Sequence, residues 1–162
     1  MLKSVINRKP GKDWRMKTEP WRKLEEENPS LAAFGRERLD GKVAYLATIR
    51  EDGSPRAHPV TPVIGNGGCY LFVEPSSFKA RDLQENGNLC MHCAMNDSSG
   101  SSGEFQISGK VEAVTDEKKR LATEAIASYK PSASYLLFEM KISEALGISY
   151  RGGRPLRTRW VP

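Results

Sequence analysis

Residues 43–95 read VAYLATIREDGSPRAHPVTPVIGNGGCYLFVEPSSFKARDLQENGNLCMHCAM, and this stretch decides the fold. Its beginning, residues 42–50, alternates in polarity and is rich in β-branched and aromatic residues, which is typical of a strand. Asp52-Gly53 then suits the positive φ values of a tight hairpin turn. A second strand, a second turn and a third strand follow at residues 55–64, 66–68 and 69–73. We therefore expect three strands that run antiparallel to one another.

The second of these strands carries a basic segment, Pro55-Arg56-Ala57-His58-Pro59-Val60. Because successive side chains of a strand alternate between its faces, Arg56, His58 and Val60 share one face. A guanidinium and an imidazole are thus expected to point the same way. Pro59 and Pro62 cannot donate to a strand ladder, so we expect this strand to be bent, bulged or paired on one side only.

A short helix is expected after the third strand, because Ser76 or Ser77 is a suitable N-cap and Asn86-Gly87 a suitable stop. The unpaired N–H groups of its first turn, the helix dipole and the ammonium of Lys79 together favour an anion. Arg56 would add a planar fork that binds two phosphate oxygens. The ordinary alternative is a capped helix with solvated cations, and the basic strand beside it favours the anion site.

The length of 162 residues suits one domain with a single core. We expect a basic N-terminal arm over residues 1–28, partly disordered or packed on the body, and a cofactor-binding domain over residues 29–149. Residues 150–162 are expected to form a basic tail, a candidate cover for the site. Other expected elements are helices at residues 29–40 and 115–126, a strand at residues 105–113 and a last long strand at residues 135–142.

The order of these elements resembles the pyridoxamine 5′-phosphate oxidase-like family of FMN-binding split barrels, from about Leu31 onward. The motifs that carry the resemblance are the segment Pro55 to Val60, Ser77-x-Lys79-Ala80, Asn86-Gly87-Asn88 and Ser108 to Glu112. The resemblance implies a mainly β fold with short helices, an antiparallel split β-barrel, and a homodimer whose two subunits share two cofactor sites. It also implies bound FMN, with Arg56, Ser77 and Lys79 at the phosphate and His58, Pro59 and Val60 along the ring.

Two departures from the family pattern bear on the substrate. Where pyridoxamine-phosphate oxidases carry a second arginine just before the lysine, this chain has Phe78, so one phosphate contact is lost. Where they carry a glutamine that reaches the ring, it has Glu104, whose charge would disfavour an anionic reduced flavin. We therefore expect a short relative, a flavin-dependent oxidoreductase that acts on a small molecule other than a vitamin B6 phosphate.

Two alternatives from other functional classes stay open. One is a deazaflavin-dependent reductase, because Arg151 and Arg154 would suit a longer and more anionic cofactor. The other is a non-catalytic module that binds flavin or haem. In these readings His58 is the candidate proton donor, ring contact or haem ligand, and its ordinary alternative is a hydrogen-bonded structural histidine.

Composition excludes several other classes. The net charge of +5 comes largely from the two ends of the chain, and only 8% of residues are aromatic, so no basic and aromatic surface for nucleic acid is expected. The absence of a long apolar run predicts no membrane anchor or signal peptide, and hence reduced thiols in a cytoplasmic protein. Cys90 and Cys93 are three residues apart in an expected strand and point to opposite faces, so we expect no metal there.

Overall fold

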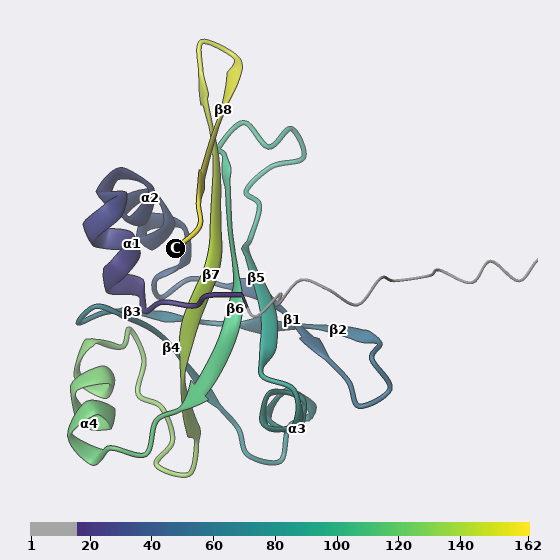
Figure 1. Ribbon diagram of the computed structural model, residues 1–162, viewed down its shortest axis with the longest axis vertical. Helices are drawn as coiled ribbons and strands as arrows, with labels where there is room; N and C mark the ends of the chain where they lie inside the picture. Colours follow the sequence, from purple (N-terminus) through teal and green to yellow (C-terminus); the bar gives the residue numbers. More distant parts are fainter. Residues whose placement is uncertain (1–15) are drawn as a thin grey trace, which may run out of the picture.

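A computed structural model describes residues 16–162, which form four helices and eight strands (Figure 1). The helices are α1 (Trp21–Glu27), α2 (Pro29–Leu39), α3 (Phe78–Glu85) and α4 (Glu117–Ile126). The strands are β1 (Ala44–Ile49), β2 (Pro55–Val60), β3 (Val63–Gly65), β4 (Gly68–Val73), β5 (Asn88–Cys93), β6 (Glu104–Ala113), β7 (Leu136–Arg151) and β8 (Arg154–Trp160). The expected fold class, a mainly β antiparallel architecture with short helices, is confirmed.

The strands form one sheet in the order β2-β1-β5-β6-β7-β4-β3, with β8 paired to β7. The two edge strands, β2 and β3, are neighbours in the chain, and only Thr61 and Pro62 separate them. The chain therefore leads from one edge of the curled sheet to the other, while no ladder joins the two edges. This arrangement is a split barrel, in which the barrel is left open between β2 and β3.

The second expected strand differs from the prediction, because it is two strands. The ladder breaks at Thr61 and Pro62, where proline cannot donate, so β2 pairs only with β1 and β3 only with β4. Pro59 stands on an edge strand, which agrees with the expected one-sided pairing. Both expected turns are present, with a positive φ of 82° at Gly53 and 78° at Gly67.

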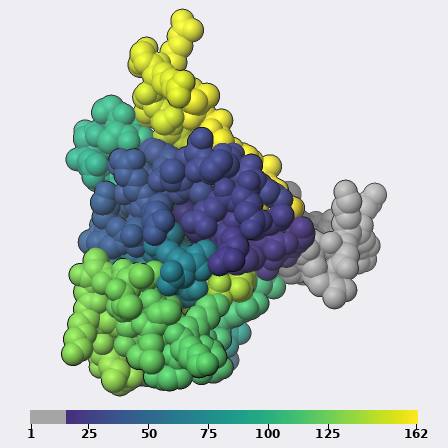
Figure 2. All heavy atoms as spheres, turned by 90° about the vertical axis from the view of Figure 1, so that its left-hand side faces the viewer, coloured from purple at the N-terminus to yellow at the C-terminus, as the bar shows by residue number. Residues whose placement is uncertain are grey.

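The main core lies between the sheet and the first two helices. Phe105 of β6 is fully buried, and its ring meets the rings of Trp21 and Phe34 edge to face at 6.2 Å each. Figure 2 shows α1 and α2 on one face of the molecule, with α4 (green) below them. Within the range assigned to a basic arm, α1 was not expected, and its Trp21 and Leu24 are fully buried. The rest of that range, residues 1–15, lies outside the described residues.

The residues expected to form a C-terminal tail belong to a β-hairpin. β7 is 16 residues long and continues past the expected end at residue 142, and β8 returns along it. Trp160 closes the hairpin against the body, where its Nε1 donates to Oε2 of Glu27 at 2.8 Å. Figure 1 shows this hairpin projecting from the end of the sheet that lies away from α3. None of the helices between residues 16 and 162 is long and apolar enough to cross a membrane.

Candidate functional site

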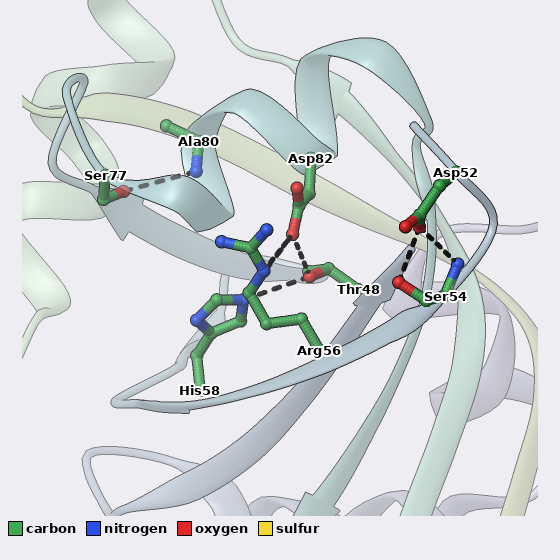
Figure 3. A network of polar contacts seen from close by, with 8 residues as sticks. All are labelled: Thr48, Asp52, Ser54, Arg56, His58, Ser77, Ala80 and Asp82. Atoms are coloured by element: carbon green, nitrogen blue, oxygen red, sulfur yellow. Dashed lines mark hydrogen bonds and ion pairs between the residues drawn. The ribbon is translucent and has the colours of Figure 1, made fainter. Parts of the chain in front are cut away.

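Side chains of β2 alternate as the sequence predicts. Arg56, His58 and Val60 are half-buried, while Ala57 and Pro59 are exposed. Figure 3 shows Arg56 and His58 extending from β2 toward α3. The alternation therefore places the predicted guanidinium and imidazole together, next to the helix whose start was predicted to bind an anion.

A buried carboxylate on α3 receives these side chains. Asp82 is 2% exposed, and its Oδ2 accepts a hydrogen bond of 2.7 Å from Oγ1 of Thr48, which is fully buried on β1. The Nε2 atom of His58 lies 3.0 Å from the same threonine oxygen. Because the single hydroxyl hydrogen goes to the carboxylate, Thr48 accepts from His58, and we assign the imidazole proton to Nε2. Nδ1 is left as an acceptor, pointing away from the network in Figure 3.

The charge state of His58 agrees with this assignment. Burial lowers its pKa, and the positive charges of Lys79 and Arg56 lower it further, against the opposing effect of Asp82. The imidazole is therefore neutral at pH 7. A neutral ring with Nε2 protonated can accept a hydrogen bond or a proton at Nδ1, but it has no proton to donate there.

Arg56 is held by its inner end. Its Nε lies 3.4 Å from Oδ2 of Asp82, an ion pair without an aligned hydrogen bond, and its guanidinium carbon lies 4.5 Å from the centre of the Phe78 ring. Its two terminal amino groups have no hydrogen-bond partner among residues 16–162. The fork of this arginine is thus positioned but free to bind an anion.

The beginning of α3 is an N-capped turn. Ser77 accepts from the N–H of Ala80 at 3.2 Å and donates to the carbonyl of Glu74 at 2.7 Å, so its hydroxyl is committed to the fold. The backbone N–H groups of Phe78 and Lys79 and the ammonium of Lys79 have no partner within the described part of the chain. Hydrogen bonds from Ser76 lower the pKa of Glu74, so a carboxylate lies just before these free donors.

A cavity of about 300 Å³ lies beside this turn. Three of the predicted residues, Pro59, Val60 and Lys79, line it, whereas Arg56, His58 and Ser77 do not. Aromatic side chains make up much of its remaining wall, and the other lining residues are Val43, Thr61, Phe72, Glu74, Tyr129 and Tyr135. The cavity is therefore suited to a flat, largely apolar group, with Lys79 and Glu74 as its charged lining residues.

Several residues of this site were not predicted. Alternation along β1 could have identified Thr48, because it places this residue on the buried face with Ala44 and Leu46. A polar group buried there needs a hydrogen-bond partner, and that partner is Asp82. The aromatic residues Tyr129 and Tyr135 had no signal, because they come from a loop far along the chain. Glu104, expected near the ring, does not line the cavity and instead lies 3.6 Å from His92 across β5 and β6.

The chain is similar to several known proteins. A family model described as pyridoxamine 5′-phosphate oxidase matches residues 35–148. A haem-binding protein from Mycobacterium smegmatis superposes with a TM-score of 0.61 and 18% identity, over 76% of this chain and 54% of that one. This chain thus spans about half the length of that protein.

Two further solved structures are similar. An F420 reductase gives a TM-score of 0.53 and 18% identity, over 68% of this chain and 94% of its own. A NimC/NimA family protein from Clostridium acetobutylicum gives 0.56 and 14%, over 75% and 86%. Identities this low show a shared fold alone. A search of curated proteins finds no match to the sequence.

Proposed function

Because the chain belongs to the pyridoxamine 5′-phosphate oxidase family, we propose that it is an oxidoreductase that binds FMN between β2 and the start of α3. One observation carries the proposal: at the start of α3, where the Arg56 guanidinium packs on the Phe78 ring, the fork of Arg56, the ammonium of Lys79 and the first N–H groups of the helix have no partner among residues 16–162. Cations and helix-start N–H groups in this arrangement are what a phosphate ester requires.

Each residue has a distinct task in phosphate binding. Asp82 and Phe78 hold the inner end of Arg56, so less side-chain freedom is lost when its fork binds phosphate oxygens. Lys79 adds a mobile point charge. Ser77, whose hydroxyl already makes two hydrogen bonds, fixes the shape of the turn and does not contact the phosphate in our proposal.

The cavity supplies the surroundings of the ring. Pro59 and Val60 of β2 form one side, and Phe72, Tyr129 and Tyr135 provide aromatic surface that excludes water. Bound FMN would supply the chemistry, which is hydride or electron transfer at its ring. His58 does not line the cavity, and its Nε2–H donates to Thr48, so its task in our proposal is to hold β2 against α3 through Thr48.

We further propose that a second copy of the chain covers this face. Val43, just before β1, and Tyr45 of β1 are 51% and 52% exposed, and Tyr45 lies opposite Pro59 in the ladder with β2. Val43 also lines the cavity, so a partner seated on this apolar face would complete the cavity wall. Arg151 and Arg154 lie in the hairpin that projects away from α3 in Figure 1, so any contact of that hairpin with the site would come from the partner subunit.

A cofactor titration tests the proposal. The protein, purified without added cofactor, is titrated in parallel with FMN, the deazaflavin cofactor and haem, and its absorption spectrum is recorded. We expect selective FMN binding that Arg56→Met and Lys79→Met each weaken by about 1.5–3 kcal/mol, the range for a hydrogen bond to a charged group. Lys118→Met, an exposed lysine on α4, is the matched control and should bind like the unaltered protein.

Two results of the same titration would contradict the proposal. Preference for the deazaflavin cofactor or for haem would replace FMN by that alternative. Equal FMN affinity in all three variants would remove the phosphate site at α3. Turnover with a nicotinamide donor, measured on the FMN-loaded protein, separates an oxidoreductase from a module that only binds the cofactor.

A further inference from the structure

A second hollow, of about 350 Å³, lies on the side of the sheet that carries α1 and α4. It shares no lining residue with the cavity beside α3. On the face shown in Figure 2, the turn between β3 and β4 (teal) lies between α1 above and α4 below, and this is where the hollow opens. Its charged lining residues are Arg22, Lys119, Glu139 and Lys141.

The floor of the hollow is an ionised carboxylate. Glu139 of β7 is only 5% exposed, and its Oε2 contacts Nζ of Lys119 at 2.5 Å and Nζ of Lys141 at 2.8 Å. Burial alone would raise the pKa of this carboxyl group, but the hydrogen bonds and positive charges of the two lysines together outweigh burial and lower it. The other oxygen, Oε1, accepts no hydrogen bond from residues 16–162.

The wall of the hollow adds donors that the fold does not use. Arg22 of α1 is exposed, and its guanidinium makes a single long contact of 3.4 Å to the carbonyl of Asn66. Tyr70 lies directly opposite Glu139 in the ladder of β4 with β7, and its hydroxyl has no hydrogen-bond partner in the described part of the chain. Lys119 stays 40% exposed although it contacts Glu139.

The balance of charge favours an anion. Neutralising Glu139 requires one cation, yet three line the hollow, and among residues 16–162 the one other carboxylate in an ion pair with them is the exposed Glu112, 3.8 Å from Lys141. The excess of positive charge therefore attracts an anion. Oε1 of Glu139 can accept a hydrogen bond, so the same ligand should also carry a hydroxyl group that donates to it. We propose that this hollow binds a small phosphorylated polyol, with its phosphate on Arg22 and Lys119 and a hydroxyl on Oε1 of Glu139.

Ribose 5-phosphate, inorganic phosphate and ribose are suitable probes, each titrated into the full chain by isothermal calorimetry. We expect ribose 5-phosphate to bind at least tenfold more tightly than either of the other two. Arg22→Met and Lys119→Met should each weaken its binding at least tenfold. Lys118→Met, the neighbouring exposed lysine, is the control and should leave the affinity unchanged.

Three outcomes would overturn the proposal: no binding of ribose 5-phosphate, an equal affinity for inorganic phosphate, or an equal loss in the Lys118→Met control. Because Arg22 is exposed and outside the core, its variant tests the site even if Lys119→Met fails to fold. The titration is repeated after saturation with FMN and in Lys79→Met. Binding that persists there, with the same loss in Arg22→Met, belongs to this hollow and is independent of the FMN site.

Discussion

The hydroxyl of Thr48 donates to Oδ2 of Asp82 over 2.7 Å and so ties β1 to α3 inside the molecule. His58 joins this pair from β2 and Arg56 contacts the same carboxylate oxygen, so three elements meet at one buried charge. The carboxylate is the anchor that holds the edge strand β2 against the helix whose start we propose as the phosphate site.

Removing this hydroxyl should therefore weaken the fold. Thr48→Val keeps the shape but removes the hydrogen bond to the buried Asp82 carboxylate and the acceptor of the His58 Nε2–H, which is expected to lower the free energy of unfolding by about 1–3 kcal/mol. Thr48→Ser retains the hydroxyl and serves as the control. Urea unfolding of the three proteins measures the difference, and equal loss in both variants would show that packing of the methyl group, not the hydrogen bond, stabilises this position.

The lowered pKa of His58 predicts how stability depends on pH. The pKa of histidine in the unfolded chain is about 6.5, so below that pH the unfolded chain holds a proton that the native imidazole lacks. This contribution to stability is present above pH 6.5 and is lost as the pH falls toward the folded-state pKa. In His58→Gln, whose amide can still donate to Thr48, we expect a smaller loss of urea stability between pH 7.5 and 5.5. His92 remains in both proteins, so an identical loss in the two would contradict the assignment of a neutral His58.

Gly35 should not tolerate even a methyl group. A Cβ there would lie 2.3 Å from Cζ of Phe105, and that ring is enclosed by Trp21 and Phe34. Gly35→Ala is therefore expected to destabilise the protein by about 1–3 kcal/mol through overpacking, although alanine normally favours a helix. Thermal unfolding of Gly35→Ala, Phe105→Leu and the double variant checks the cause. The double variant should lose less than the two single losses combined, and strict additivity would count against the contact.

The three thiols should differ in reactivity. Burial raises the pKa of the Cys69 thiol to about 12, with a further contribution from the negative charges of Asp40 and Glu139, so it has almost no thiolate at neutral pH. Cys93 is also buried, whereas Cys90 is half-buried. Alkylation of the native protein with iodoacetamide, followed by mass spectrometry, should label Cys90 first. Cys90→Ser is expected to remove the fast phase, and rapid labelling of Cys69 would contradict its burial.

Local rules were sufficient for a large part of the fold. The turns at Asp52-Gly53 and Asn66-Gly67 and the N-cap at Ser77 follow from the conformations that these residues prefer over a few positions. The common face of Arg56, His58 and Val60 follows from the two-residue period of a strand. None of these features depends on what lies across the molecule, which is why the sequence predicts them.

The sequence by itself thus determined most of the strands, the two turns, the helix start and the basic strand, and through them the family. Only the tertiary structure decided that Asp82 receives Arg56 and Thr48, that Tyr129 and Tyr135 line the cavity beside β2, and that the tail is a hairpin. These contacts join residues distant in the chain, and they depend on the strand order and on how the sheet curls. Side-chain period and capping carry no information about either, because both act within a few residues.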